Sequence, residues 1–278
     1  MPELPEVHAH AERLAATYAG ATLERFLALS FTALKTFDPP PEAAVDRVLD
    51  RVGRRGKHLL LGFDDLTFVV HLMQGGRLRV DPKPTRKPRG GLARWYFAGR
   101  DALLLTEAGT EHSAGVWVVR GDALAQEPLQ GLGPEADRLD ADEMARLLST
   151  ASMRLHTFLR RQSLIAGLGR RLANEVCHRA RLSPFATTRS LDAGAAERIV
   201  AAIREAVDEG LAFERTLAAM SASKDRPGRV HGRGGKPCPV CGDDIRTVEY
   251  RAYTVAYCPT CQTEGKVLAD NTTSKFLR

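Results

Sequence analysis

Two pairs of cysteines near the end of the chain constrain its fold more than any other feature. They form Cys238-Pro-Val-Cys241 and Cys258-Pro-Thr-Cys261, with 16 residues between the pairs. Two turns of this kind present four thiolates tetrahedrally to one zinc ion, and the intervening residues are long enough for a β-hairpin. The sequence therefore predicts a zinc ribbon with one structural Zn2+. The fifth cysteine, Cys177, lies in a helical pattern, where we expect buried packing and no ligand role.

The charge of the chain favours a polyanionic partner. The formal net charge is +6 and the pI is about 9.2, and the basic residues cluster in loops and helix starts, which fits nucleic acid. No segment has the ~20 apolar residues of a membrane span and no secretory signal is visible, so we expect a cytoplasmic protein. We also expect a monomer. The clusters are Arg51, Arg54, Arg55 and Lys57; Lys83, Arg86, Lys87 and Arg89; Arg160, Arg161, Arg170 and Arg171; and Lys224, Arg226, Arg229 and Arg233.

The first half of the chain has the pattern of an antiparallel β-sandwich or barrel. Short apolar runs with tight turns between them extend from about residue 22 to 120. A loop rich in proline and cations interrupts them at residues 81–91. The expected strands are His58 to Phe63, Leu66 to Leu72, Ala93 to Ala98, Ala102 to Thr106 and Gly115 to Arg120.

The second half has helical periodicity. Asp140 and Glu143 have the spacing of an N-terminal capping pair for a helix through Leu148. The sequence thus predicts an α+β protein: an antiparallel β-sandwich domain at 1–125, a linker at 126–139, a helical domain at 140–222, and the zinc ribbon with a basic tail at 223–278. Further helices are expected over Met153 to Arg161, Gly169 to Arg179 and Asp192 to Gly210.

The first seven residues, Met1-Pro2-Glu3-Leu4-Pro5-Glu6-Val7, contain a group that could act as a nucleophile. Removal of Met1 would leave Pro2 as a secondary amine, a nucleophile that is less protonated than lysine at neutral pH. Pro5 suits the first turn of a helix running to about Tyr18. Pro2 and Glu3 would then lie at its N-terminus, where the helix dipole favours an ionised carboxylate and an unprotonated amine. On these residues alone, the simpler alternative is a helix start with no chemical role.

Several motifs together resemble the formamidopyrimidine-DNA glycosylase and endonuclease VIII family of base-excision repair enzymes. The motifs occur in family order and cover nearly the whole chain. They are MPELPEV; Arg55-Gly-Lys57; His71-Leu72 with Gly75-Gly76-Arg77-Leu78; Gln162-Ser-Leu-Ile-Ala-Gly-Leu-Gly169 with Ala173-Asn-Glu-Val176; and the segments around the four cysteines. Alone, Lys57 would be a solvated cation, His71 a structural histidine, and residues 162–176 an ordinary helix hairpin with glycines that permit a tight turn.

The resemblance implies a function in DNA repair. A damaged nucleotide is flipped out of duplex DNA, the Pro2 nitrogen attacks C1', the base leaves, and β-elimination from the Schiff base cuts the strand. Glu3 would move protons and Lys57 would steady a phosphate, with zinc only holding the hairpin. The DNA contacts implied are His71, Gln74, Gly169, Arg170 and Arg251.

The chain departs from the family pattern at several points. Tyr253 occupies the hairpin position where most members have an arginine that assists δ-elimination, although Arg251 is near. Gln74, beside Met73, replaces a methionine that fills the void of the flipped base, and Arg170 replaces an asparagine. Residues 106–113 lack the arginine and aromatic residue that face the orphaned base. Residues 217–229 are short, which favours oxidised pyrimidines or formamidopyrimidines over 8-oxoguanine. The tail 263–278 has no assigned role beyond weak attraction to DNA.

Two other classes of function are alternatives to a DNA-repair enzyme. A catalytically silent lesion-binding paralogue would explain the missing arginine, but it has no need for Pro2, Glu3 and Lys57. A general zinc-ribbon protein of transcription or RNA metabolism would leave the opening motif without an explanation. The predicted function is therefore a DNA glycosylase with abasic-site lyase activity.

Overall fold

Two units make up the fold. In the computed structural model, the residues described are 1–278 except 87, 109–112, 222–224, 252 and 269–278. The first unit comprises residues 1–131 and 213–223, and the second comprises 132–212 and 224–278. Lys87, Lys224, the middle of loop 106–113 and most of the basic tail therefore lie outside the described residues. No described helix is long and apolar enough to cross a membrane.

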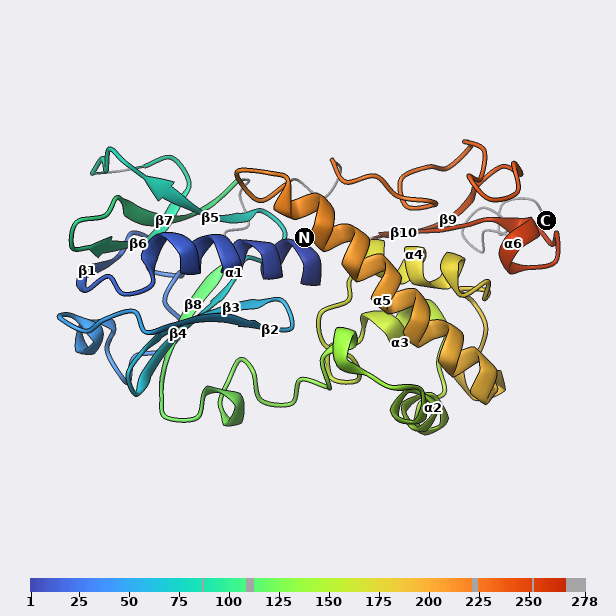
Figure 1. The fold of residues 1–278 in the computed structure, drawn as a ribbon, viewed down its shortest axis with the longest axis horizontal. Helices are drawn as coiled ribbons and strands as arrows, with labels where there is room; N and C mark the ends of the chain where they lie inside the picture. The colour runs from blue at the N-terminus through green and yellow to red at the C-terminus, as the bar shows by residue number, and fades with distance from the viewer. Residues whose placement is uncertain (87, 109–112, 222–224, 252, 269–278) are drawn as a thin grey trace. The chain divides into compact units, whose positions relative to one another are not determined.

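The first unit is an antiparallel β-sandwich, as predicted. Its two four-stranded sheets have the orders β1-β6-β7-β5 and β2-β3-β4-β8 (Figure 1). The expected strands are all present, and three more were not predicted: β1, β2 and β5, whose charged residues and glycines hide the alternation of a strand. The bounds are β1 Leu23–Ala28, β2 Arg51–Arg55, β3 His58–Phe63, β4 Leu66–His71, β5 Gly76–Asp81, β6 Gly91–Phe97, β7 Ala102–Glu107 and β8 Gly115–Arg120.

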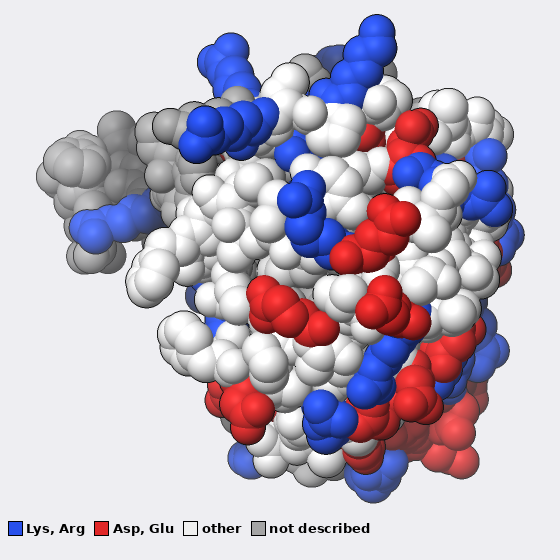
Figure 2. All heavy atoms as spheres, turned by 90° about the vertical axis from the view of Figure 1, so that its left-hand side faces the viewer, with Lys and Arg blue, Asp and Glu red and all other residues white. Residues whose placement is uncertain are grey.

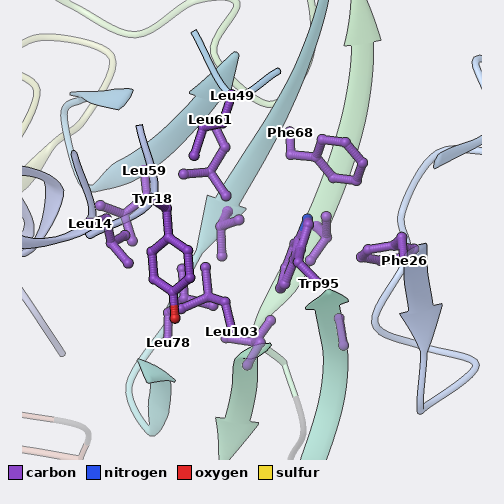
Figure 3. Packing of buried hydrophobic residues seen from close by; sticks show 14 of the residues in the cluster. Leu14, Tyr18, Phe26, Leu49, Leu59, Leu61, Phe68, Leu78, Trp95 and Leu103 are labelled. Carbon is purple, nitrogen blue, oxygen red and sulfur yellow. The ribbon is translucent and has the colours of Figure 1, made fainter. Parts of the chain in front are cut away.

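The core of the first unit lies between the two sheets and is completed by α1 (Leu4–Tyr18). Figure 3 shows Phe68, Trp95 and Phe26 packed beside one another, and their ring centroids lie 5.1 to 5.9 Å apart. Leu14 and Tyr18 of α1 enter the same cluster, and α1 packs against β2 and β3. Burial of this apolar face fixes α1 on the sandwich, because each large apolar side chain contributes about 1.5–3 kcal/mol when buried.

The first unit also contains the end of the longest helix, α5 (Ala193–Arg215). Glu214 is fully buried and accepts hydrogen bonds from the backbone N–H and the hydroxyl of Ser221. Arg13 of α1 donates to the carbonyl oxygens of Glu214 and Leu217, at 2.9 and 3.4 Å. These bonds fasten residues 214–221 to α1.

The second unit is helical and carries the predicted hairpin. Asp140 caps α2 as expected, accepting from the Glu143 N–H at 2.8 Å. Asn174 of α4 joins the helices to the hairpin, since its Oδ1 accepts from the Ala256 N–H at 3.2 Å. Cys177 is buried, as predicted, and burial raises the pKa of its thiol. The bounds are α2 Ala141–Thr150, α3 Leu155–Arg160, α4 Arg170–Arg179, β9 Arg246–Tyr250, β10 Tyr253–Tyr257 and α6 Pro259–Gln262, with short 3-10 turns η1 Pro41–Ala44, η2 Ala123–Ala125, η3 Ala136–Arg138 and η4 Thr188–Ser190.

Some arginines of the basic clusters are not free to bind a polyanion. Arg171 and Arg226 are buried, and Arg229 forms ion pairs with Glu205 and Glu209. Figure 2 shows one face of the molecule, on which basic and acidic side chains are interspersed. Packing therefore removes part of these clusters from the surface: Arg171 donates to the Pro227 carbonyl oxygen at 3.4 Å, and Arg229 is paired with glutamates of α5.

Candidate functional site

The N-terminus of α1 buries the residues of the opening motif. Pro2 and Glu3 are both buried, and Glu3 is the N-cap of the helix. Its backbone N–H donates to Glu6 Oε2 at 2.9 Å, and its own carboxylate accepts from the Glu6 N–H, forming a reciprocal capping box. The cap thereby fixes the Glu3 carboxylate at the first turn of α1, directly after Pro2 in sequence. Sequence reasoning missed Glu6, although its spacing of three from Glu3 is the signature of this cap.

Lys57 and His71 belong to one cluster. Lys57 lies in the two-residue turn between β2 and β3, after Gly56 with φ +54°, and its side chain is buried. His58 pairs with His71 across β3 and β4, and their ring centroids are 4.5 Å apart. Burial, with added repulsion from His58 and Lys57, lowers the pKa of His71 to about 3. His71 is therefore neutral at physiological pH, beside the lysine cation.

The turn between β4 and β5 follows this cluster directly. His71 Nδ1 accepts from the Met73 N–H at 3.2 Å, so the ring proton resides on Nε2. Gln74 is exposed. The turn is tight at Gly76, where a Cβ would lie 2.2 Å from the Leu72 carbonyl oxygen. This geometry presents Gln74 to solvent on a backbone that a larger residue at 76 would distort.

The two-turn connection between α3 and α4 is organised by Gln162. Its side chain accepts from the Gly167 N–H at 3.1 Å and donates to the carbonyl oxygens of Arg160 and Leu168. Gly167 has φ +102°, which explains this glycine, whereas Gly169 is the N-cap of α4 in an extended conformation that any residue adopts. Arg170 is half-buried as the first residue of α4. Of these two glycines, the backbone dihedral angles require glycine only at 167.

The four paired cysteines form the predicted metal site. Their Sγ atoms all lie within 4.8 Å of one another. The Cys238–Cys261 and Cys241–Cys258 sulfur distances are 3.9 and 3.3 Å, close to the roughly 3.8 Å of a tetrahedral site with Zn–S bonds of about 2.3 Å. The donor set and its geometry fit one structural zinc ion.

A histidine from α4 contacts the zinc site and was missed from the sequence. His178 Nε2 lies 3.3 Å from Cys238 Sγ, and the imidazole is buried. A ring N–H pointed at a ligand thiolate stabilises its charge and holds its orientation. The only signal in the sequence was its position beside the buried Cys177.

The remaining predicted contact, Arg251, is exposed in the turn of the β9–β10 hairpin. The structure thus gathers Lys57 and His71 in one cluster of the first unit, with Pro2 and Glu3 at the start of α1, which packs against β2 and β3. The second unit holds Gly169, Arg170, Arg251 and the four cysteines.

Models of known protein families match segments of both units. Residues 1–108 match the formamidopyrimidine-DNA glycosylase N-terminal domain, and residues 125–221 match its H2TH domain. Residues 235–263 match a zinc finger found in formamidopyrimidine-DNA glycosylase and isoleucyl-tRNA synthetase proteins.

Full-length relatives give the same result. The formamidopyrimidine-DNA glycosylase of Heliobacterium modesticaldum is 32% identical over 280 residues, covering 94% of this chain and 100% of that protein. The crystal structure of MutM (Fpg) from Thermus thermophilus has a TM-score of 0.81 at 30% identity, covering 95% and 100% of the two chains. A Lactococcus lactis Fpg mutant bound to Fapy-dG-containing DNA shares the fold, with a TM-score of 0.84, 22% identity, and coverage of 94% and 100%. The chain belongs to the formamidopyrimidine-DNA glycosylase family.

Proposed function

We propose that this protein removes oxidised bases from duplex DNA and then cuts the strand at the abasic site. The observation that carries the proposal is the burial of Pro2 and Glu3 together at the N-terminus of α1. Membership of the glycosylase family supports the substrate class. The lyase step rests on the chemistry of Pro2.

Pro2 is suited to act as the nucleophile once Met1 is removed. The partial positive charge at the start of α1 and the loss of water on burial both disfavour the protonated amine, so both favour the nucleophilic form. A secondary amine that adds to an aldehydic carbon forms an iminium without an N–H to lose. That iminium is a persistent electron sink.

The proposed reaction proceeds in balanced steps. The Pro2 nitrogen bonds to C1' as the glycosidic bond breaks, and the base leaves with a proton. The sugar ring opens, and the Pro2 iminium acidifies the C2' hydrogens. Loss of one of these protons expels the 3' phosphate by β-elimination. Hydrolysis of the iminium then frees the enzyme. Glu3, held by the capping box, would deliver and accept the protons.

The other predicted residues serve DNA binding in this proposal. Lys57 would contact a phosphate near the reacting sugar, and neutral His71 would donate a hydrogen bond through Nε2. Gln74 would enter the space left by the flipped base. Gly169 and Arg170 at the start of α4, and Arg251 on the hairpin, would bind the backbone. We expect a monomer to suffice for this binding.

Zinc would support the hairpin. The four cysteines hold the ion, and it supplies the rigidity that keeps β9, β10 and α6 together. The residues assigned to catalysis lie in the first unit and the cysteines in the second.

Borohydride trapping tests the proposal. Protein lacking Met1 is mixed with duplex DNA that holds one abasic site, and the adduct is mapped by mass spectrometry. We expect a covalent bond to the Pro2 nitrogen. A matched protein with an added residue before Pro2 keeps the fold but has an amide at that nitrogen, so it should give no adduct. Glu3→Gln should slow strand cleavage by roughly 10²–10⁴-fold.

Two outcomes would contradict the lyase mechanism. One is an adduct of equal yield from the extended protein, which would place the nucleophile elsewhere. The other is tight binding to abasic DNA with no adduct from the processed protein, which would indicate a lesion-binding protein with a glycosylase fold. A panel of oxidised bases, tested with the same protein, then identifies the preferred lesion.

A further inference from the structure

The zinc hairpin and α3 meet in a stack of aromatic rings. Tyr250 and Tyr253 pair directly across the hairpin, with ring centroids 4.8 Å apart and planes inclined by 15°. His156 of α3 lies 5.9 Å from Tyr253 with planes inclined by 16°. Arg160, the last residue of α3, places its guanidinium carbon 4.0 Å from the centre of the Tyr253 ring. A cation this close to a ring face is attracted by the ring quadrupole.

Regular elements hold this stack in place. α3 packs on α4, and α4 packs on β10, so the residues of the stack are supported by helix and strand (Figure 1). His156 is buried, and burial with the nearby Arg160 charge lowers the pKa of its imidazole to about 3. The imidazole is therefore neutral and adds no repulsion toward Arg160. The planar guanidinium is thereby oriented with little remaining freedom.

Arg160 differs from two other arginines of this unit, Arg179 and Arg229, in having no anionic partner within the described part of the chain. Arg179 and Arg229 each have glutamate partners. Among the residues that the structure describes, Arg160 has no carboxylate within ion-pair distance, and its Nε is buried without a hydrogen-bond partner. Folding has already removed part of this guanidinium from water without supplying an anion. Binding of an anion therefore costs less desolvation free energy than it would at a fully solvated arginine.

The charges around Arg160 indicate the kind of anion. Arg161 follows in sequence and is exposed, Arg170 begins α4, and Arg251 is exposed in the hairpin turn beside Tyr250. Arg161 thus adjoins Arg160 in sequence, and Arg251 adjoins Tyr250 of the stack. A polyanion that extends across several of these cations fits better than a single small anion.

We propose that Arg160, oriented by the ring of Tyr253, binds a phosphate of the DNA backbone. The proposal rests on the DNA-binding function proposed above. Tyr253 is then a positioning residue, which holds on the hairpin a cation supplied by α3. The stack makes the hairpin and α3 one phosphate-binding surface, with Arg160 as its planar, bidentate donor.

The salt dependence of DNA binding tests this role. Affinity of the full-length, zinc-loaded protein for a duplex with an uncleavable abasic analogue is measured from about 50 to 200 mM salt. Arg160→Ala should lower the slope of log K against log salt by about 0.9, the value of one phosphate contact. It should weaken binding roughly ten- to hundredfold at the lowest salt. Arg198→Ala, which removes an exposed arginine from α5, should change neither quantity.

Variants at Tyr253 separate positioning from charge. Tyr253→Phe keeps the ring and should bind like the wild type. Tyr253→Leu removes the ring while Arg160 keeps its charge, so affinity should fall several-fold and Phe at 253 should restore it. Zinc content and thermal unfolding of each variant establish that the hairpin is intact. If the Arg160→Ala protein loses zinc, Arg160→Gln is used in its place, because it removes the charge with less loss of packing. The slope of log K against log salt for Arg160→Gln then tests the proposal.

A purely structural stack gives a different result. The inference is overturned if a folded, zinc-loaded Arg160→Ala or Arg160→Gln protein keeps the wild-type slope and affinity while wild-type protein binds abasic DNA. If wild-type protein does not bind abasic DNA at all, the proposed function and this inference both fail. The two failures are thus distinguishable in one series of titrations.

Discussion

His71 illustrates how a single residue acquires its state from its neighbours. It stacks on His58, accepts from the Met73 N–H, and lies close to Lys57. Each contact favours the neutral imidazole, since protonation would place a cation on the acceptor nitrogen and beside a lysine. His10 of α1 is also buried, and burial with the nearby Arg13 lowers its pKa to about 4. Both histidines are therefore neutral in the folded first unit.

This state predicts a loss of stability in acid. Between pH 6.5 and about 3, the unfolded chain holds a proton on His71 that the folded chain lacks, so the free energy of unfolding falls as pH decreases. The loss is about 1.4 kcal/mol per pH unit, or roughly 2 kcal/mol at pH 5. His71→Gln should remove this contribution, measured as the difference between urea unfolding at pH 7 and pH 5. Gln74→Ala, an exposed neighbour, is the control, and an unchanged acid loss in His71→Gln would contradict the prediction.

At the scale of elements, one carboxylate joins α4 to the segment that enters the zinc finger. Glu175 accepts from the backbone N–H groups of Arg229, Val230 and His231 at 2.9 to 3.0 Å, and from Arg179 at 2.7 Å. Burial alone would raise the pKa of Glu175, but these donors outweigh it and lower the pKa to about 2. The segment thus depends on an ionised side chain of the helix.

Replacement of this carboxylate should loosen the second unit. In Glu175→Gln, an amide N–H would face backbone N–H donors, leaving buried groups without acceptors. We expect a loss of about 1–3 kcal/mol in the unfolding free energy of the second unit. Glu209→Gln removes an exposed partner of Arg179 and Arg229 and should cost at most about 1 kcal/mol. Denaturant unfolding followed by near-UV circular dichroism measures both, and equal costs would contradict the assigned role.

At the scale of the whole molecule, the two units have separate sources of stability. A large apolar cluster lies within the first unit, and the helices of the second unit bury apolar residues of their own, such as Phe158 and Ile199. The buried cluster around the zinc site contains only Val230, Cys238, Ile245, Ala256 and Cys258, with Cys261 at its edge, among the residues that the structure describes. So small a cluster does not offset the entropy of ordering the hairpin without metal.

Loss of zinc should therefore affect one unit selectively. Cys238→Ser should abolish stoichiometric zinc binding and unfold β9 and β10, whereas the melting transition of the first unit should stay where it is in the wild type. Calorimetry with zinc analysis checks this, and chelation of the wild-type metal should have the same effect. A common shift of both transitions would show that the stability of the first unit depends on the zinc finger.

The sequence by itself determined the features that depend on neighbours along the chain. The spacing of the cysteines was enough for the zinc site, the capping pair at Asp140 and Glu143 for α2, and Pro5 with the helical pattern for α1. Apolar runs and turns indicated the sandwich. Strands β1, β2 and β5 were not predicted, because their exposed charges and glycines weaken the alternation that signals a strand.

Only the tertiary structure decided which distant residues meet. The sheet orders, the His58–His71 pair, the Glu175 contacts with residues 229–231 and the stack of Arg160 on Tyr253 all join residues from separate elements. No local pattern encodes such contacts, since they follow from the burial of whole faces and from the pairing of buried polar groups. Buried arginines such as Arg171 show the same limit: composition indicated their charge, and packing determined where that charge is used.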